Sequence, residues 1–145
     1  VLQEKSKTLK VSHIGKIPGH SMFKDWALPN RPQCFLPFDE MVPALHPGRE
    51  VQIIEFKQIC AKPNFWFGAD DFQGSRFDAA EVKFPGMLVK DMPNPCGLPF
   101  RMIDGRRRME KLIRAGDAAG PFVIFQYEEI EPYIQNFEIE ENATQ

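Results

Sequence analysis

The 145-residue sequence lacks most of the patterns that assign a function directly. Its cysteines stand far apart and form no CxxC pair, which excludes a zinc knuckle and a thioredoxin-like redox motif. Its three histidines form no HxH, HxxxH or HExxH pattern. We therefore predict no dedicated metal site. The cysteines, Cys34, Cys60 and Cys96, are interpreted as buried or neutral thiols in a reducing compartment.

The sequence also lacks a large excess of charge and any long apolar run. The net charge is −2 and the pI is about 5.9, which argues against a surface coated in positive charge for wrapping nucleic acid. No apolar stretch approaches the roughly 18 residues that a membrane span needs. None follows the first five residues either, so neither a secretory signal nor membrane association is expected.

Proline and phenylalanine are abundant instead, with 13 residues each. Six prolines fall within residues 13–48, and their spacing argues against a long helix in this segment. The same stretch is too rich in aromatic side chains for a free linker. We therefore expect residues 1–48 to form an irregular proline-rich N-terminal arm packed onto the domain.

A regular pattern begins after Gly48. Apolar, β-branched runs predict strands at residues 51–56, 87–92, 100–103 and 122–127, the last one central because it is apolar on both faces. Helical spacing predicts a helix over 106–115, with Met109, Leu112 and Ile113 on one face, and a second over 130–137. The sequence thus predicts an α+β domain over residues 49–137, with a small mixed sheet and flanking helices, followed by an acidic tail at 138–145.

The functional signal concentrates where the third strand meets the first helix. Six basic and two acidic residues give the segment from Arg101 to Arg114 a net charge of +4. Asp104 and Gly105 form the turn, and Arg106, Arg107 and Arg108 open the helix. Cations in a first helical turn oppose the helix dipole, and an anion bound there reverses the effect. A strand end, a glycine and an arginine-rich helix start therefore predict a phosphate site.

Two alternatives remain open for these residues. The arginines could point into water, or Asp104 could cap the helix and pair with one of them, because aspartate is a favoured N-cap.

The run from Phe100 to Leu112, F-R-M-I-D-G-R-R-R-M-E-K-L, resembles the second conserved box of the ParB/sulfiredoxin-like superfamily. Residues 51–64 resemble the first strand of that family and its exit, and residues 122–130 resemble the strand and acidic turn after the box. The similarity extends over roughly residues 51–137, and phage-encoded single-domain members are the nearest in character. The resemblance implies the fold of that superfamily and a cytoplasmic location in a bacterium or a phage-infected cell.

The sequence departs from each known activity of the family. Sulfiredoxins carry a catalytic cysteine directly after the box glycine, where Arg106 stands here. Partition ParB proteins bind the phosphates of CTP with G-E-R-R, and Arg106 replaces the glutamate. Free serine kinases use D-G-H-H-R, and Arg106 and Arg107 replace both histidines. Arginine holds charge but cannot act as a base near neutral pH, which favours phosphate binding over catalysis.

The resemblance also suggests further candidates. Asp104 is a tentative catalytic residue that could accept a proton or help to hold Mg²⁺, and Glu55 is a weaker positional candidate whose plain interpretation is a solvent-facing strand residue. Loop contacts to a ligand are candidates at Trp66, Asp70, Asp71 and Arg76. A hydrophobic plug with two solvated carboxylates is the favoured interpretation of the first three, and Arg76 could equally be a surface residue.

The expected function is therefore binding of a nucleotide or another phosphorylated small molecule, with Mg²⁺ if the ligand is ATP or CTP. Hydrolysis or phosphoryl transfer is a further expectation. One alternative is a non-catalytic DNA-associated or protein-interaction module of the same fold, although the acidic tail disfavours DNA. A purely structural accessory protein is a third.

Overall fold

The structure, a computed structural model, describes residues 8–12, 34–61 and 85–140. The chain divides into two compact units, one from Gly48 to Tyr127 and one made of residues 1–47 and 128–145. Both contain strands and helices, so the α+β class and the mixed sheet are confirmed.

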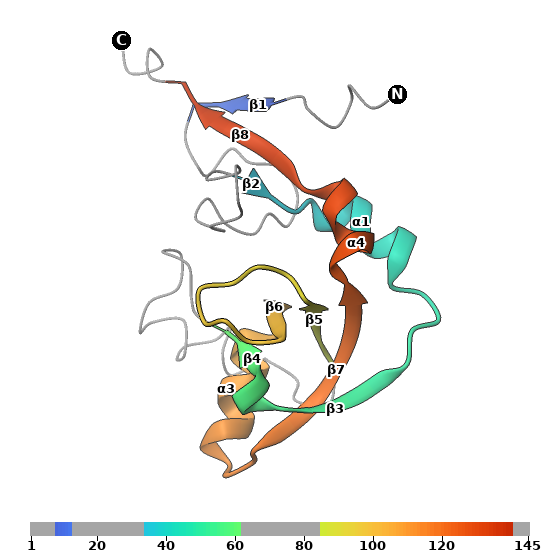
Figure 1. The fold of residues 1–145 in the computed structure, drawn as a ribbon, viewed down its shortest axis with the longest axis vertical. Helices are drawn as coiled ribbons and strands as arrows, with labels where there is room; N and C mark the ends of the chain where they lie inside the picture. The colour runs from blue at the N-terminus through green and yellow to red at the C-terminus, as the bar shows by residue number, and fades with distance from the viewer. Residues whose placement is uncertain (1–7, 13–33, 62–84, 141–145) are drawn as a thin grey trace. The chain divides into compact units, whose positions relative to one another are not determined.

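The central unit is built on a five-stranded sheet in the order β3-β7-β5-β6-β4 (Figure 1). Its strands are β3 (Val51–Glu55), β4 (Ile59–Cys60), β5 (Gly86–Lys90), β6 (Phe100–Asp104) and β7 (Ala119–Gln126), and a 3-10 turn, η3 (Phe56–Gln58), links β3 to β4. β7 runs antiparallel to β3 and parallel to β5, while β6 runs antiparallel to β5 and parallel to β4. The predicted central position of 122–127 is confirmed, because β7 has a neighbour on each side.

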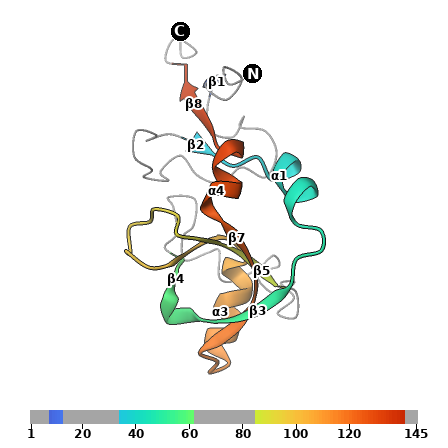
Figure 2. The ribbon, with the colours of Figure 1, turned by 45° about the vertical axis from the view of Figure 1, so that its right-hand side comes forward.

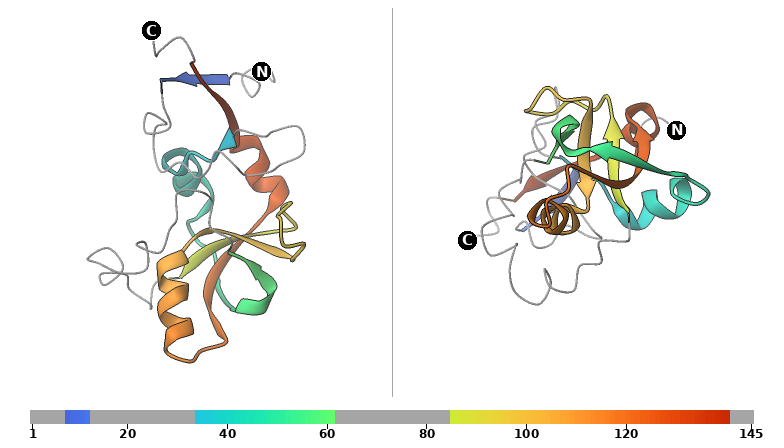
Figure 3. Two further views of the ribbon diagram at one scale, coloured as in Figure 1. Left: turned by 90° about the vertical axis from the view of Figure 1, so that its left-hand side faces the viewer. Right: turned by 90° about the horizontal axis from the view of Figure 1, so that it is seen from below.

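Helix α3 (Arg106–Arg114) lies along one face of this sheet (Figure 3). The core on that face joins Met109 of the helix to Ile54, Leu88, Met102 and Phe122 of four strands. Because strand side chains alternate between faces, the intervening residues point to the opposite face, where Val89, Val123 and Phe125 are also buried. The helix predicted over 106–115 is confirmed, and Gly116, with φ of 96°, follows its C-cap as expected.

One helical position differs from its prediction. Met109 is buried and Leu112 is half-buried, but Ile113 is 42% exposed. The sheet therefore covers a narrower apolar stripe of α3 than the spacing of Met109, Leu112 and Ile113 predicts. Ile113 lies at the margin of that stripe.

The second unit holds a three-stranded sheet in the order β1-β8-β2. β8 (Gln135–Ile139) pairs in parallel with β1 (Thr8–Val11) and antiparallel with β2 (Cys34–Phe35). Phe35 and Phe137 meet edge to face with ring centroids 6.2 Å apart, and Leu9 packs against them. The remaining elements are α1 (Phe38–Leu45), α4 (Tyr127–Ile130) and η5 (Glu131–Tyr133).

Two predictions for this unit need correction. Residues 38–45, expected to be irregular, form α1, because Pro37 supplies an extended N-cap (φ −75°) and a single internal proline, Pro43, does not prevent an eight-residue helix. The helix predicted over 130–137 ends at Tyr133, and β8 follows. Pairing with β1 and β2 outweighs the local helical spacing of Ile134 and Phe137.

Candidate functional site

The site is the arginine turn, which we define as Gly105 to Arg108 between β6 and α3. β6 ends at Asp104, and Gly105 occupies the N-cap of α3 with φ of 108°. A Cβ on Gly105 would lie 2.9 Å from the Cα of Gly86, and one on Gly86 would lie 2.7 Å from the carbonyl oxygen of Asp104. Gly105 is therefore required by its left-handed backbone and by the close packing of the turn against β5. The same close packing requires a glycine at position 86.

Asp104 pairs with Arg108 one helical turn later. The Nη2 atom of Arg108 donates to Oδ2 of Asp104 at 2.5 Å, and both side chains are partly exposed. The N-cap residue of α3 is Gly105, which has no side chain, and no side-chain cap is found for this helix among the described residues. Of the alternatives left open by the sequence, pairing of Asp104 with an arginine is observed, whereas side-chain capping is not.

Arg106 and Arg107 lie half-buried in the same turn. Burial lowers the pKa of the Arg106 guanidinium below its usual value, and the nearby Glu110 carboxylate partly offsets the shift. The Nε atoms of both arginines are shielded from solvent and make no hydrogen bond in the described part of the chain, although both residues have other interactions. The turn therefore holds partly desolvated positive charge.

The charge distribution along α3 is one-sided. The helix contains five basic residues and one acidic residue, and its first turn has no acidic side chain. Glu110 accepts a hydrogen bond from Arg114, whose Nε lies 3.2 Å from Oε2, and its charge also acts on Arg106 one turn earlier. The first turn, where backbone N–H groups already carry partial positive charge, thus contains no acidic residue of its own, and Asp104 just before the N-cap is the carboxylate adjacent to it in the chain.

Glu55 is not brought to this turn. Asp104 pairs with Met87, Met87 with Val123, and Val123 with Val51, so the end of β6 shares a row of the sheet with the start of β3. Glu55 lies at the other end of β3, opposite Ala119, about 13 Å further along the strand. It is exposed, with a 4.0 Å contact to Lys57, in keeping with the plain interpretation of a solvent-facing residue.

The structure brings together Asp104, Gly105, Arg106, Arg107 and Arg108. The predicted loop contacts, Trp66, Asp70, Asp71 and Arg76, lie outside the described residues. Within the described ranges, no group of three or more histidine, cysteine or acidic residues could hold a metal ion.

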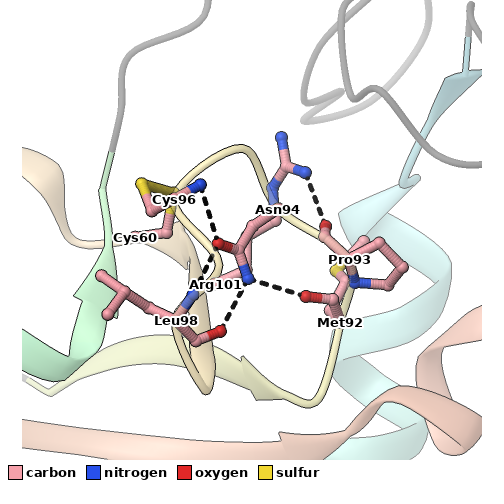
Figure 4. The surroundings of a disulfide bond; sticks show 7 residues. All are labelled: Cys60, Met92, Pro93, Asn94, Cys96, Leu98 and Arg101. Carbon is pink, nitrogen blue, oxygen red and sulfur yellow. Dashed lines mark hydrogen bonds between the residues drawn. A yellow bond between two sulfur atoms is a disulfide. The ribbon is translucent and has the colours of Figure 1, made fainter.

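A second feature of the central unit was missed by the sequence reasoning. Cys60 of β4 and Cys96 of the β5–β6 loop are joined by a disulfide, with Cα atoms 5.6 Å apart (Figure 4). The prediction of three thiols is therefore wrong, and Cys34, which is buried, is the cysteine that lies outside the disulfide. The pairing arises because β4 lies beside β6 and so brings Cys60 to the loop that precedes β6.

Asn94 organises that loop from within. Its side-chain nitrogen donates to the carbonyl oxygens of Met92 and Leu98 at 2.9 and 2.8 Å, and its oxygen accepts from the backbone N–H groups of Cys96 and Leu98, each at 3.1 Å (Figure 4). The buried Arg101 donates to the carbonyl oxygen of Pro93 at 2.9 Å. A loop that uses both side-chain groups of one asparagine is held rigidly in the native state.

No family model, curated protein or solved structure matches the chain. Among the helices of the described residues, none has the length and apolar character needed to cross a bilayer.

Proposed function

We propose that the chain is a nucleotide-binding domain of the ParB/sulfiredoxin-like type, and that the arginine turn binds the phosphate groups of ATP or CTP. One observation carries the proposal. Three consecutive arginines occupy the first turn of α3, at the end of the helix where positive charge is least favourable.

The lowered pKa of Arg106 supports this argument. Its shift reports that burial disfavours the charged guanidinium in the unliganded protein. A phosphate would add negative charge beside these guanidinium groups and accept hydrogen bonds from both them and the helix N-terminus. Binding of an anion would thus remove an unfavourable feature of the fold.

The pair between Asp104 and Arg108 is compatible with such a ligand. Arginine has five N–H donors, and its contact with Asp104 is made by one nitrogen. The remaining donors can bind phosphate while Asp104 fixes the position of the side chain. Asp104 is also the carboxylate that would hold Mg²⁺ together with the nucleotide phosphates, because Mg²⁺ sites often use one or two carboxylates and substrate oxygens.

The proposal commits to binding, and a hydrolytic or transfer step would depend on Asp104. Arginine cannot accept the proton of an attacking group, so it can only stabilise charge on a phosphate. Release of inorganic phosphate from ATP or CTP, measured beside binding, would show whether the domain is also an enzyme.

The test compares two arginines of the same helix. We expect Arg108→Ala to abolish binding of Mg-ATP or Mg-CTP in isothermal titration while leaving the far-UV circular dichroism unchanged. Arg114→Ala removes the same charge from the exposed C-terminal turn and should retain binding. Equal affinities in the wild type and in Arg108→Ala would contradict the site assignment.

One observation favours a second candidate, a DNA-associated or protein-interaction module. The positive charge of α3 continues beyond the first turn to Lys111 and Arg114, as a backbone-contacting helix requires. A salt-sensitive thermal shift with a short DNA duplex, without a response to nucleotides, would support this function instead.

A cytoplasmic location stays a prediction. Disulfides persist mainly in oxidising compartments. The redox state of Cys60 and Cys96 in cells is therefore the observation that bears on it.

A further inference from the structure

The outer edge of β3 combines exposed apolar side chains with an open strand edge. Val51 and Ile53 are 52% and 70% exposed, and they share one face of the sheet. Among the described strands, β3 pairs only with β7, so its other edge has no strand beside it there (Figure 2). Natural proteins usually protect such edges, because an apolar open strand readily pairs with another chain.

The backbone groups that face this open edge can be identified from the pairing with β7. Ile53 lies opposite Pro121, which has no N–H group, and the N–H of Phe56 donates to the carbonyl oxygen of Ala118 at 2.9 Å. In an antiparallel pair, hydrogen-bonded and non-hydrogen-bonded residues alternate. The even-numbered residues of β3 therefore bond to β7, and the N–H and C=O groups of Val51, Ile53 and Glu55 point outward.

We propose that this edge binds the same edge of a second copy of the chain, as an antiparallel strand pair whose twofold axis passes Gln52. In that register Val51 lies opposite Ile53 of the partner subunit, and both residues present their outward backbone groups, so each such pair exchanges two N–H···O bonds. The exposed apolar side chains of both copies then cover one another. The contact is isologous, because Val51 of each copy meets Ile53 of the other copy.

Charge complementarity selects this register and this occupant. With the axis at Gln52, Arg49 lies opposite Glu55 of the partner subunit. The guanidinium of Arg49 donates to the carbonyl oxygen of Ile124 at 3.0 Å and lies over the Phe125 ring, 4.5 Å from its centroid, so it stays on the β7 side and acts on Glu55 of the partner subunit as a nearby charge and not as a direct ion pair. Glu55 is exposed and makes a 4.0 Å contact with Lys57, which leaves its carboxylate accessible.

The neighbouring register is poorer. An axis at Ile53 would also match the outward backbone groups. It would set Val51 opposite a carboxylate and Arg49 opposite Lys57 of the partner subunit, and like charges directly opposite are unfavourable. The sequence around Gln52 is self-complementary, with β-branched apolar residues one position away on each side and opposite charges three positions away.

The register predicts which cysteine substitution links two copies. A residue on the axis of a non-hydrogen-bonded pair has its Cα about 4.5 Å from its counterpart, within the range of a disulfide. Gln52→Cys should therefore give a covalent dimer under mild oxidation on a non-reducing gel. Glu50→Cys, also exposed but offset from its counterpart by four residues, should not. Cross-linking of Glu50→Cys without cross-linking of Gln52→Cys would overturn the register.

Sedimentation equilibrium tests the association itself. We expect a concentration-dependent monomer–dimer equilibrium for the wild type and a monomer for Ile53→Lys, which places a charge in the centre of the edge. Glu55→Arg should weaken the dimer about tenfold at low salt, because two symmetry-related contacts change from attraction to repulsion, and added salt should restore part of the loss. Glu140→Arg makes the same change of charge at an exposed position outside every helix and strand and should leave the equilibrium unaltered.

Two results would overturn the proposal. One is a wild type that stays monomeric up to about 1 mM, where even an interface with a Kd of 1 mM is partly occupied. The other is a dimer that persists in Ile53→Lys, which would place the contact elsewhere or assign the β3 edge to a different partner.

Discussion

Removal of the Cys60–Cys96 disulfide is expected to lower the free energy of unfolding by about 4 kcal/mol. The change is made either by a reductant or by the double substitution Cys60→Ala/Cys96→Ala. The expected loss is large relative to the 5–15 kcal/mol typical of whole domains. The disulfide is therefore expected to be a principal contributor to the stability of the central unit.

The magnitude follows from the length of chain that the bond closes. The two cysteines are 36 residues apart. In the chain-entropy description, a closed loop of this length removes about 13 cal/mol/K from the unfolded ensemble, or about 4 kcal/mol at 25 °C. On the native side, Asn94 holds the β5–β6 loop through four hydrogen bonds, so this loop should keep its conformation without the disulfide. The predicted effect thus acts mainly through the unfolded state.

Urea denaturation followed by tryptophan fluorescence measures this difference, with and without dithiothreitol. The double variant is the matched control, because reductant should not change its unfolding midpoint. Alkylation in denaturant, read by mass spectrometry, gives an independent check: oxidised protein should take up label at Cys34 alone, and reduced protein at all three cysteines.

Either of two results would refute the expected contribution of the disulfide to stability. Alkylation of all three cysteines in protein equilibrated with oxidised glutathione would show that the bond does not form. A bond that forms, but whose reduction leaves the unfolding midpoint unchanged, would show that the unfolded chain is not restrained by it.

Three further predictions concern single residues. Gly105→Ala should destabilise the protein by about 2–4 kcal/mol in urea titrations, because positive φ is strained and the added methyl meets Gly86. Gly116→Ala, with φ of 96° and open space around it, should cost only about 1 kcal/mol, and equal losses would contradict the close approach of Gly105 to Gly86. Arg106→Gln should raise the free energy of unfolding by about 0.5 kcal/mol and weaken Mg-ATP binding in calorimetry, because it removes a partly desolvated cation from the first turn; a loss of stability would show that the arginine serves the fold. Asn94→Ala should lower the unfolding free energy by about 2–4 kcal/mol, since the backbone N–H groups of Cys96 and Leu98 lose their acceptor; a neutral result would show that water replaces the side chain.

Local pattern was sufficient for α3 and for every strand of the central unit except β4, which was not predicted. The four strands predicted there and α3 depend on alternation, helical spacing and the Gly116 stop, and all of these are short-range signals. The central position of β7 in the sheet could also be predicted from the sequence, because a strand that is apolar on both faces needs neighbours on both sides.

Features that depend on pairing between strands far apart in the sequence could not be predicted from the sequence alone. The disulfide follows from the position of β4 beside β6, and a sequence with three cysteines gives no indication of which two meet. β8 forms where spacing favours a helix because β1, more than 120 residues earlier, lies beside it. Ile113 matches the helical period but lies past the margin of the sheet, and that margin is a property of the packed structure.

The structure changes which residues of the D-G-R-R-R segment count as evidence for a ligand. Gly105 is part of the predicted phosphate site, yet its positive φ and the close approach of Gly86 explain this glycine by packing alone. Asp104 is likewise explained by its pair with Arg108. Arg106 and Arg107 make contacts of their own, but their position at the start of α3 opposes the helix dipole, and burial makes the charge of Arg106 less favourable still. The proposed function therefore depends most on these two side chains, with Arg108 as a further phosphate contact, and a variant that gains stability as it loses nucleotide affinity is the result that only a binding role explains.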